Sequence, residues 1–410
     1  MTIICQARAA VLSAALVGLA IAATPASAQK QYDTGVTDTE IKIGNILPYS
    51  GPASAYGVIG KTEAAYFNKI NAEGGINGRR INFITYDDSS SPPKTVEQAR
   101  KLVEGDEVFL IFNSLGTAAN SAIQKYMNQK KVPQLFVATG ATKWGDPKNF
   151  PWTMGWQPNY QTEGRIYAKY ILDTKPDGKI AVLYQNDDYG KDLLKGLTDG
   201  LGAKASMIIA KEPYELTDPT IDNHVVSLKS TGADIYVSVT TPKFAAQSLR
   251  KVKELGWSPA MHILNNVASS IGGVIKPAGY DTAQGIISVT YGKDVTDPQW
   301  KDDPGVKEYD AFIQKWYPDA NRIDGSVGYG MMLAQTLTQV LKQCGDNLTR
   351  ENVMKQAANL KDFELGLLLP GIKINTSPTD FYPIEQEQLQ RFQGETWVRF
   401  GPIISGEVRD

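Results

Sequence analysis

The chain alternates between short strand-like segments and longer helix-like segments along most of its length. Residues 40–47 alternate apolar and polar side chains, as a strand does, and the apolar residues of segment 60–71 recur at helical spacing. The same patterns predict strands at 80–86, 108–112, 134–138, 179–184, 206–210, 235–239, 262–264 and 286–290, and helices at 94–103, 118–129, 190–201, 221–230, 243–255, 305–316, 325–343 and 349–360. Because strands that alternate with helices form parallel sheets covered on both faces, the predicted fold class is α/β with doubly wound sheets.

The length of the chain and one interruption of this alternation indicate two domains. A chain of 410 residues is too long for one ordinary core. The alternation stops near residues 149–161, which are rich in Pro, Trp and Gly, and we interpret this segment as a first crossing between two lobes. Residues 388–401 alternate like a β-hairpin.

The first residues have the pattern of a secretory signal peptide. Arg8 precedes an apolar run at 9–23, and the small residues 26–28 follow it. A membrane anchor is the alternative, but the run is shorter than the ~20 residues of a spanning helix. We therefore predict a signal peptide over residues 1–28 that is cleaved after Ala28, leaving an exported, soluble protein.

Charge and cysteine content exclude several classes of protein. The net charge of −2 offers no basic surface for nucleic acid or for acidic lipids. Cys5 lies within the predicted signal peptide, so Cys344 is left alone and no intrachain disulfide is expected. An exported chain without disulfides depends on a large core, which this length permits.

No pattern of an enzyme is found. His224 and His262 have no metal-ligand spacing, and the sequence contains no G-x-S-x-G elbow and no phosphate-binding P-loop. Residues 48–52, after the first strand, are not a dinucleotide fingerprint. The acidic pairs 87–88 and 187–188 are typical of turn capping. We therefore expect no catalytic residue, no metal and no cofactor, and a nucleotide-dependent enzyme is disfavoured.

Several short motifs occur in a characteristic order. They are LPYSGP at 47–52, YG at 56–57, INAEGGING at 70–78, YDD at 86–88 and NDDYG at 186–190. In this order and spacing the chain resembles periplasmic binding proteins of the leucine/isoleucine/valine-binding type, the type I clamps of hydrophobic amino-acid ABC importers. The resemblance covers nearly the whole chain after the predicted signal peptide.

The resemblance implies two doubly wound lobes joined by three hinge crossovers, near residues 152–158, 284–290 and 370–380. Lobe one would comprise residues 39–154 and 288–375, and lobe two residues 155–287 and 376–410. It also implies a periplasmic location, an inner-membrane ABC permease as partner, a monomeric state and no role in nucleic-acid binding. A ligand sensor for a signalling partner is the alternative use of the same clamp.

Two loops are candidates for holding the carboxylate of a ligand. Loop 113–117 follows a strand and opens a helix, and loop 139–142 follows the next strand. Free amides at a helix N-terminus bind anions without Arg or Lys, and glycine allows a close approach. By resemblance we expect ligand contacts from Gly116, Thr117, Gly140, Ala141 and Thr142. The alternative is that these residues only form turns and caps.

Other candidate ligand contacts come from both lobes. By resemblance Tyr56 and Tyr189 would place aromatic rings over the ligand, one from each lobe, and Tyr291 near the second crossing is a weaker candidate. Thr241 occupies a lobe-two loop where amino-acid binders often have an aromatic residue.

One position departs from the pattern of the amino-acid binders. Where they tend to supply an acidic partner for the ligand ammonium, this chain has Asn265. A buried ammonium without a charged partner carries a large desolvation cost. We therefore expect a small hydrophobic carboxylate without an α-ammonium, such as an aromatic acid. The alternative is a branched-chain amino acid, whose ammonium would pair with Asp187 or Asp188.

Overall fold

The computed structural model describes residues 30–406. The predicted signal peptide and its cleavage point lie outside these residues. Within the described range, no helix combines the length and apolar character needed to cross a membrane.

The first lobe is built around a parallel sheet of five strands. Their spatial order is β3 (Arg80–Asp87), β2 (Glu40–Leu47), β4 (Leu110–Phe112), β5 (Gln134–Val137) and β6 (Thr153–Gly155). The three residues of β4 and the four of β5 are all buried, as expected for parallel strands covered on both faces.

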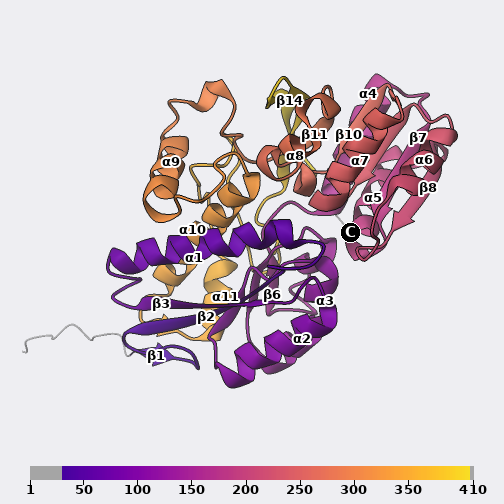
Figure 1. Cartoon of the computed structure of the whole chain (residues 1–410). Helices are drawn as coiled ribbons and strands as arrows, with labels where there is room; N and C mark the ends of the chain where they lie inside the picture. The colour runs from indigo at the N-terminus through magenta and orange to yellow at the C-terminus, as the bar shows by residue number, and fades with distance from the viewer. Residues whose placement is uncertain (1–29, 407–410) are drawn as a thin grey trace, which may run out of the picture.

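Helices from both ends of the chain complete this lobe. They are α1 (Gly57–Ala72), α2 (Pro92–Arg100), α3 (Thr117–Lys130), α9 (Pro304–Trp316), α10 (Gly325–Cys344) and α11 (Arg350–Ala357). Helices α1 and α10 pack against each other although they are far apart in sequence (Figure 1). A small parallel pair, β1 (Gln31–Tyr32) with β12 (Asn347–Leu348), also joins the two ends.

The second lobe is built around a mixed sheet of seven strands. Their order is β14 (Thr396–Ser405), β13 (Gln386–Gln393), β11 (Ile287–Thr290), β10 (Met261–Leu264), β9 (Ile235–Val239), β7 (Ile180–Gln185) and β8 (Ile208–Tyr214). Strands β11 to β8 are parallel, whereas β13 and β14 form the predicted hairpin and join antiparallel. The helices are α4 (Tyr160–Thr174), α5 (Asp188–Leu201), α6 (Asp222–Ser230), α7 (Pro242–Glu254) and the short α8 (Lys276–Ala278).

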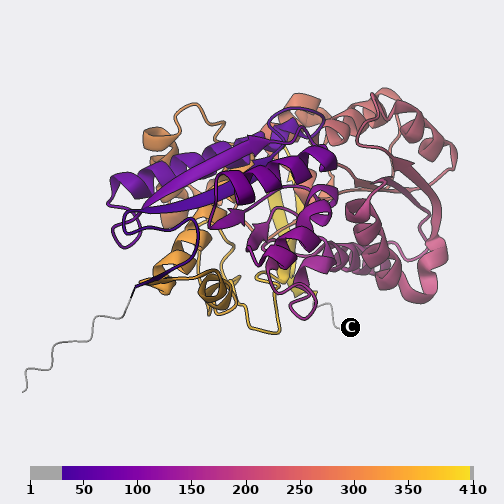
Figure 2. The ribbon, with the colours of Figure 1, turned by 90° about the horizontal axis from the view of Figure 1, so that it is seen from below.

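The chain passes between the sheets three times: after β6, after β11 and between α11 and β13. Figure 2 shows the yellow C-terminal strands near the centre of the molecule, between the indigo and magenta parts. The lobe limit predicted at residue 288 falls inside β11, whose residues 287–290 all pair with β13 of the second sheet. The other predicted limits remain predictions.

Helix α4 was missing from the sequence-based assignment. It lies against α5, and the contact is made at two glycines. A Cβ on Gly164 would lie 2.5 Å from the Leu193 oxygen, and a Cβ on Gly196 would lie 2.4 Å from the Gln161 oxygen. Glycine inside a helix lowers its helical propensity, so the close approach of the two helices weakened the helical signal of α4.

Candidate functional site

A cavity of about 600 Å³ lies between the two lobes, at the carboxyl ends of their parallel strands. Its lining includes Pro48 after β2, Thr139 after β5, Thr241 after β9 and Asn266 after β10. Parallel α/β sheets bind ligands in this crevice, because the loops after the strands and the first turns of the helices meet there.

The start of helix α3 forms one wall of the cavity. Its N-cap is Gly116, which has a φ of 97° and no side chain that could bond the amides of the first turn. Residues 116–119 all line the cavity. Since the first amides of a helix have no partner within the helix, the positive end of α3 presents donors to an anion.

Two other helices that begin at the cavity are capped differently. Asp187 accepts hydrogen bonds from the amides of Tyr189 and Gly190 at the start of α5, and Asp324 accepts one from the Ser326 amide at the start of α10. A carboxylate therefore already occupies each of these helix ends. An anionic ligand is favoured at α3 instead.

Two threonine hydroxyls lie beside the α3 terminus. Thr117 Oγ1 and Thr139 Oγ1 are 2.5 Å apart, and both side chains are buried. In such a pair one hydroxyl donates to the other, and Thr139 also hydrogen-bonds the side chain of Tyr160. Thr139 was not singled out in the sequence, although it belongs to the predicted loop 139–142.

Aromatic residues from both lobes enclose the space beside this terminus. Tyr56 and Tyr189, which are predicted to contact the ligand, both line the cavity, and so does Tyr291. The rings of Tyr189 and Tyr160 meet edge to face, with centroids 4.9 Å apart. Burial raises the pKa of Tyr56 and of Tyr189 well above the usual value, so both phenols are neutral at ordinary pH.

The hydroxyl of Tyr189 is held by its own lobe. It donates to the Thr240 carbonyl oxygen at 3.1 Å and accepts from Asn265 Nδ2 at 2.8 Å. Asn265 Oδ1 in turn accepts from the Thr240 amide at 2.9 Å. Asn265 is buried and does not line the cavity, so it supports Tyr189 instead of facing a ligand as the sequence suggested. Thr241 does line the cavity.

Gly140, Ala141 and Thr142 also lie outside the cavity lining, in contrast to Gly116 and Thr117. A Cβ on Gly140 would lie 2.4 Å from the Pro158 oxygen, which shows that this glycine packs against the first crossover. Thr142 begins a 3₁₀ turn and bonds to Asp192 of helix α5. Apart from Thr139, which lines the cavity, this loop therefore contributes to the contact between the lobes.

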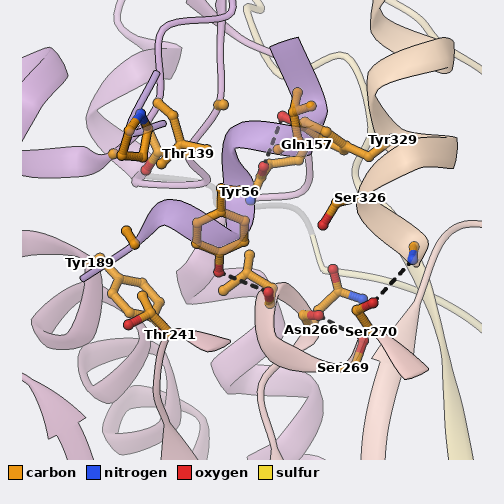
Figure 3. A pocket seen from close by; sticks show the side chains of 18 of the residues that line it. Tyr56, Thr139, Gln157, Tyr189, Thr241, Asn266, Ser269, Ser270, Ser326 and Tyr329 are labelled. Carbon is orange, nitrogen blue, oxygen red and sulfur yellow. Dashed lines mark hydrogen bonds between the residues drawn. The ribbon is translucent and has the colours of Figure 1, made fainter. Parts of the chain in front are cut away.

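Several polar residues of the site were missed by sequence reasoning. They are Gln157, Asn266, Ser269, Ser270, Ser326 and Tyr329 (Figure 3). They come from the first crossover, from the loop after β10 and from the first turns of α10, which are far apart in sequence. No motif marks them, and the position of Asn266 directly after a strand was the one usable signal.

The charged residues that line the cavity are already engaged. Lys293 is the one cation of the lining in the described residues, and its Nζ contacts both carboxylate oxygens of Asp303 at 2.8 Å and the Gly366 oxygen at 2.7 Å. Asp187 accepts a 2.7 Å bond from Gln185 in addition to its two amides. Its pKa is raised by burial, an effect that these hydrogen bonds oppose.

The remaining ionisable candidates do not form a site. Asp188 is an exposed partner of Lys143 at 3.0 Å and does not line the cavity. His224 of α6 lies near Glu212 of β8, and His262 is buried against the Tyr236 ring. In residues 30–406, no three side chains of His, Cys, Asp or Glu cluster as metal ligands would.

The two lobes are in direct contact around the cavity. The Tyr56 hydroxyl donates to the Val267 carbonyl oxygen at 2.9 Å, from one lobe to the other (Figure 3). Ser270 Oγ donates to Asp324 Oδ1 at 2.8 Å and accepts from the Gly325 amide. Thr142 of lobe one also donates to Asp192 on α5 of lobe two. The cavity is therefore enclosed by both lobes.

The sequence and the fold are similar to those of known proteins. A family described as periplasmic binding protein matches residues 40–393. Leu/Ile/Val-binding protein homolog 7 of Brucella abortus is 22% identical over 370 residues, which cover 86% of this chain and 87% of the relative. A branched chain amino acid ABC transporter structure from Thermus thermophilus with bound valine has a TM-score of 0.80 and 17% identity, and covers 90% of this chain and 97% of the other.

A second solved structure also has a similar fold. It is a solute binding protein of an ABC transporter from R. palustris in complex with benzoate, with a TM-score of 0.75 and 17% identity, covering 90% of this chain and 98% of the other. With two α/β lobes, three crossings and an enclosed cavity between them, the chain belongs to the periplasmic binding protein family and has the fold of its type I members.

Proposed function

We propose that this member of the family captures a small hydrophobic carboxylate that lacks an α-ammonium and delivers it to an ABC importer. Binding of small molecules for ABC transporters is the role of the family. The observation that carries the choice of ligand is the start of helix α3, where uncapped amides and the Thr117–Thr139 pair line the same cavity as the rings of Tyr56 and Tyr189. The positive end of the helix favours a carboxylate there.

The surroundings of this wall argue against a ligand ammonium. Asn265 uses its side chain for Thr240 and Tyr189, and it has no negative charge. A buried ammonium needs a charged or well-bonded partner to offset its loss of hydration. The benzoate-bound neighbour from R. palustris shows that this fold accommodates an aromatic acid.

A branched-chain amino acid is the second candidate, and Asp187 favours it. This carboxylate lines the cavity and keeps acceptor capacity beyond its three hydrogen bonds. The valine-bound neighbour and the name of the Brucella relative support the same candidate. Asp188, the other acid considered, is directed to Lys143 instead.

A matched pair of ligands distinguishes the two candidates. 4-Methylpentanoate is leucine without its α-amine, so titration calorimetry with both compounds, and with benzoate, isolates the effect of the ammonium. We expect the two acids to bind at least tenfold more tightly than leucine. Tighter binding of leucine would assign the amino acid, and the absence of binding by all three would refute the carboxylate site.

The lobe contacts indicate how the protein works. A ligand that docks on α3 of lobe one is enclosed when lobe two rotates onto it, and the contacts of Tyr56 and Ser270 then form. We propose that the enclosed form is monomeric and is the one that the permease recognises. Small-angle scattering should show a smaller radius of gyration after saturation with ligand; an unchanged profile would contradict this mechanism.

A further inference from the structure

The cavity extends on both sides of Tyr56. On one side lie Thr139, Tyr189 and Thr241, close to the start of α3, and we call this the head compartment (Figure 3). On the other side lie Gln157, Asn266, Ser326 and Tyr329, which we call the distal compartment (Figure 3). Tyr56 stands between them and reaches Val267 across the cavity.

The whole cavity is larger than a small acid requires. A cavity of about 150 Å³ is sufficient for a benzene molecule. The present cavity, at about 600 Å³, has about four times that volume and lies within the usual range for ligands of drug size. A benzoate or a leucine in the head compartment would leave the distal compartment to water.

The walls of the distal compartment combine apolar surface with uncharged polar groups. Ile323, Leu367 and Trp397 line the cavity on the side of α10 and the second crossover. Gln157 Oε1 accepts from the Tyr329 hydroxyl at 3.2 Å, so its Nε2 amide donors are turned to the cavity (Figure 3). Ser326 adds a hydroxyl from the first turn of α10 (Figure 3).

The cation near this compartment is already paired within the protein. Asp324 Oδ1 accepts hydrogen bonds from Ser270 and from the Ser326 amide, and Lys293 is paired with Asp303. A second carboxylate at the far end of a ligand would find Lys293 already paired and would lose its hydration. An uncharged oxygen could accept hydrogen bonds from the Gln157 amide and the Ser326 hydroxyl.

We propose that the ligand is an elongated carboxylate, whose anionic head lies at α3 and whose aromatic or aliphatic chain passes Tyr56 to end in an uncharged oxygen, such as a hydroxyl, in the distal compartment. This inference rests on the proposed function, because it takes the carboxylate position as given. It assigns Gln157 and Ser326 to the recognition of the far end of the ligand.

A series of acids of increasing length tests the use of the distal compartment. The probes are benzoate, 3-phenylpropanoate and 5-phenylpentanoate, each also with a para-hydroxyl group. Burial of each added methylene should raise the affinity about three- to fourfold until the compartment is filled. The hydroxyl should add at least a further threefold to the affinity of one of the longer acids, and less to that of benzoate.

Substitutions in the distal compartment identify its residues. Ser326→Leu should lower the affinity for the longest well-bound acid at least tenfold by occupying the space, whereas benzoate should bind as in the wild type. Ser326→Ala and Gln157→Met should remove only the gain from the para-hydroxyl. Thermal unfolding of each variant checks that the fold is kept, and Ser326→Ala serves as the size control for Ser326→Leu.

The outcomes separate this inference from the proposed function. If benzoate binds best and affinity falls with every added methylene, the distal compartment is not used and only the present inference is refuted. Equal loss of benzoate and of the long acids in Ser326→Leu would have the same meaning. If no acid of the series binds to the wild type, the carboxylate site itself is refuted.

Discussion

Thr142 donates two hydrogen bonds to one carboxylate oxygen of Asp192, from its amide at 2.7 Å and from its hydroxyl at 2.8 Å. The other oxygen of Asp192 accepts from Gln161 Nε2 at 2.7 Å. Thr142 follows β5 of lobe one, whereas Asp192 belongs to α5 of lobe two. A residue expected at the ligand is therefore part of a latch between the lobes.

Removal of this latch should weaken ligand binding without touching the cavity. Asp192→Ala removes hydrogen bonds to a charged group, which contribute about 1.5–3 kcal/mol in typical cases. Because the two bonds from Thr142 join the lobes, we expect the affinity to fall roughly ten- to a hundredfold in calorimetry. Asp173→Ala, which removes the exposed pair with Lys169, is the control. Unchanged affinity in Asp192→Ala would show that the latch does not stabilise the bound form.

The threonine pair at the α3 terminus should matter for every carboxylate. Thr117→Val keeps the shape of the side chain and removes its hydroxyl, so we expect an affinity loss of about three- to thirtyfold with little change in stability. Thr198→Val, whose hydroxyl only bonds back to Leu194 within α5, is the control. A valine at Gly116 would be a poorer test because the φ of 97° there strains any side chain. Wild-type affinity of Thr117→Val would exclude this hydroxyl from the site.

Glu163 should make the stability of lobe two depend on pH. Burial raises its pKa to about 7, and Glu387, whose pKa burial also raises, faces it. The folded protein therefore holds a proton on Glu163 that the unfolded chain loses above about pH 4.5. The stabilisation is present below that pH and is lost as the pH rises through about 7, a change of roughly 3 kcal/mol in the free energy of unfolding.

The variant Glu163→Gln isolates this effect. The amide keeps an oxygen that can accept from the Asn266 amide and the Tyr167 hydroxyl, which Glu163 Oε1 contacts at 2.7 and 2.8 Å. We expect urea unfolding of the variant to show a smaller loss of stability between pH 5 and pH 8 than the wild type. The exposed substitution Glu97→Gln should leave the profile unchanged. Parallel profiles for wild type and Glu163→Gln would rule out this source of the pH dependence.

His262 should act in the opposite direction, at lower pH. Burial lowers its pKa to about 3, and its ring lies 4.7 Å from that of Tyr236. The folded protein keeps the imidazole neutral, whereas the unfolded chain binds a proton below about pH 6.5. Stability is therefore lost as the pH falls, by about 2 kcal/mol between pH 7 and pH 5. In His262→Phe this part of the acid sensitivity should vanish; if the variant loses stability with acid as steeply as the wild type, His262 is not the cause.

Much of the fold could be predicted because apolar periodicity reports burial. The strand at 40–47 was predicted with the bounds of β2, and the helix predicted at 349–360 corresponds to α11 (Arg350–Ala357). Strand β8 was placed at 206–210 but spans Ile208–Tyr214, because its residues alternate between half-buried and exposed, only Tyr214 is fully buried, and Pro213 lies within it. An edge strand such as β8 shows weak apolar periodicity in the sequence, because no other strand pairs with one of its edges.

The cavity was predictable only where a local pattern marks it. Gly116 and Thr117 follow a strand and open a helix, and the structure places both in the lining. Only tertiary packing brings Gln157 and Ser326 to the cavity, so no local sequence pattern could reveal them. Asn265 and Thr142 were named by resemblance to family positions in loops, and such a match does not determine the direction of a side chain.

The C-terminal hairpin of β13 and β14 forms one edge of the seven-stranded sheet, while residues 304–357 supply helices to the other lobe. Neither lobe can therefore be produced as a stable fragment by cutting the chain at a single point. During synthesis both lobes also remain incomplete until the last few dozen residues have left the ribosome. Because both lobes are completed so late, the chain is better kept unfolded until all of it has been synthesised.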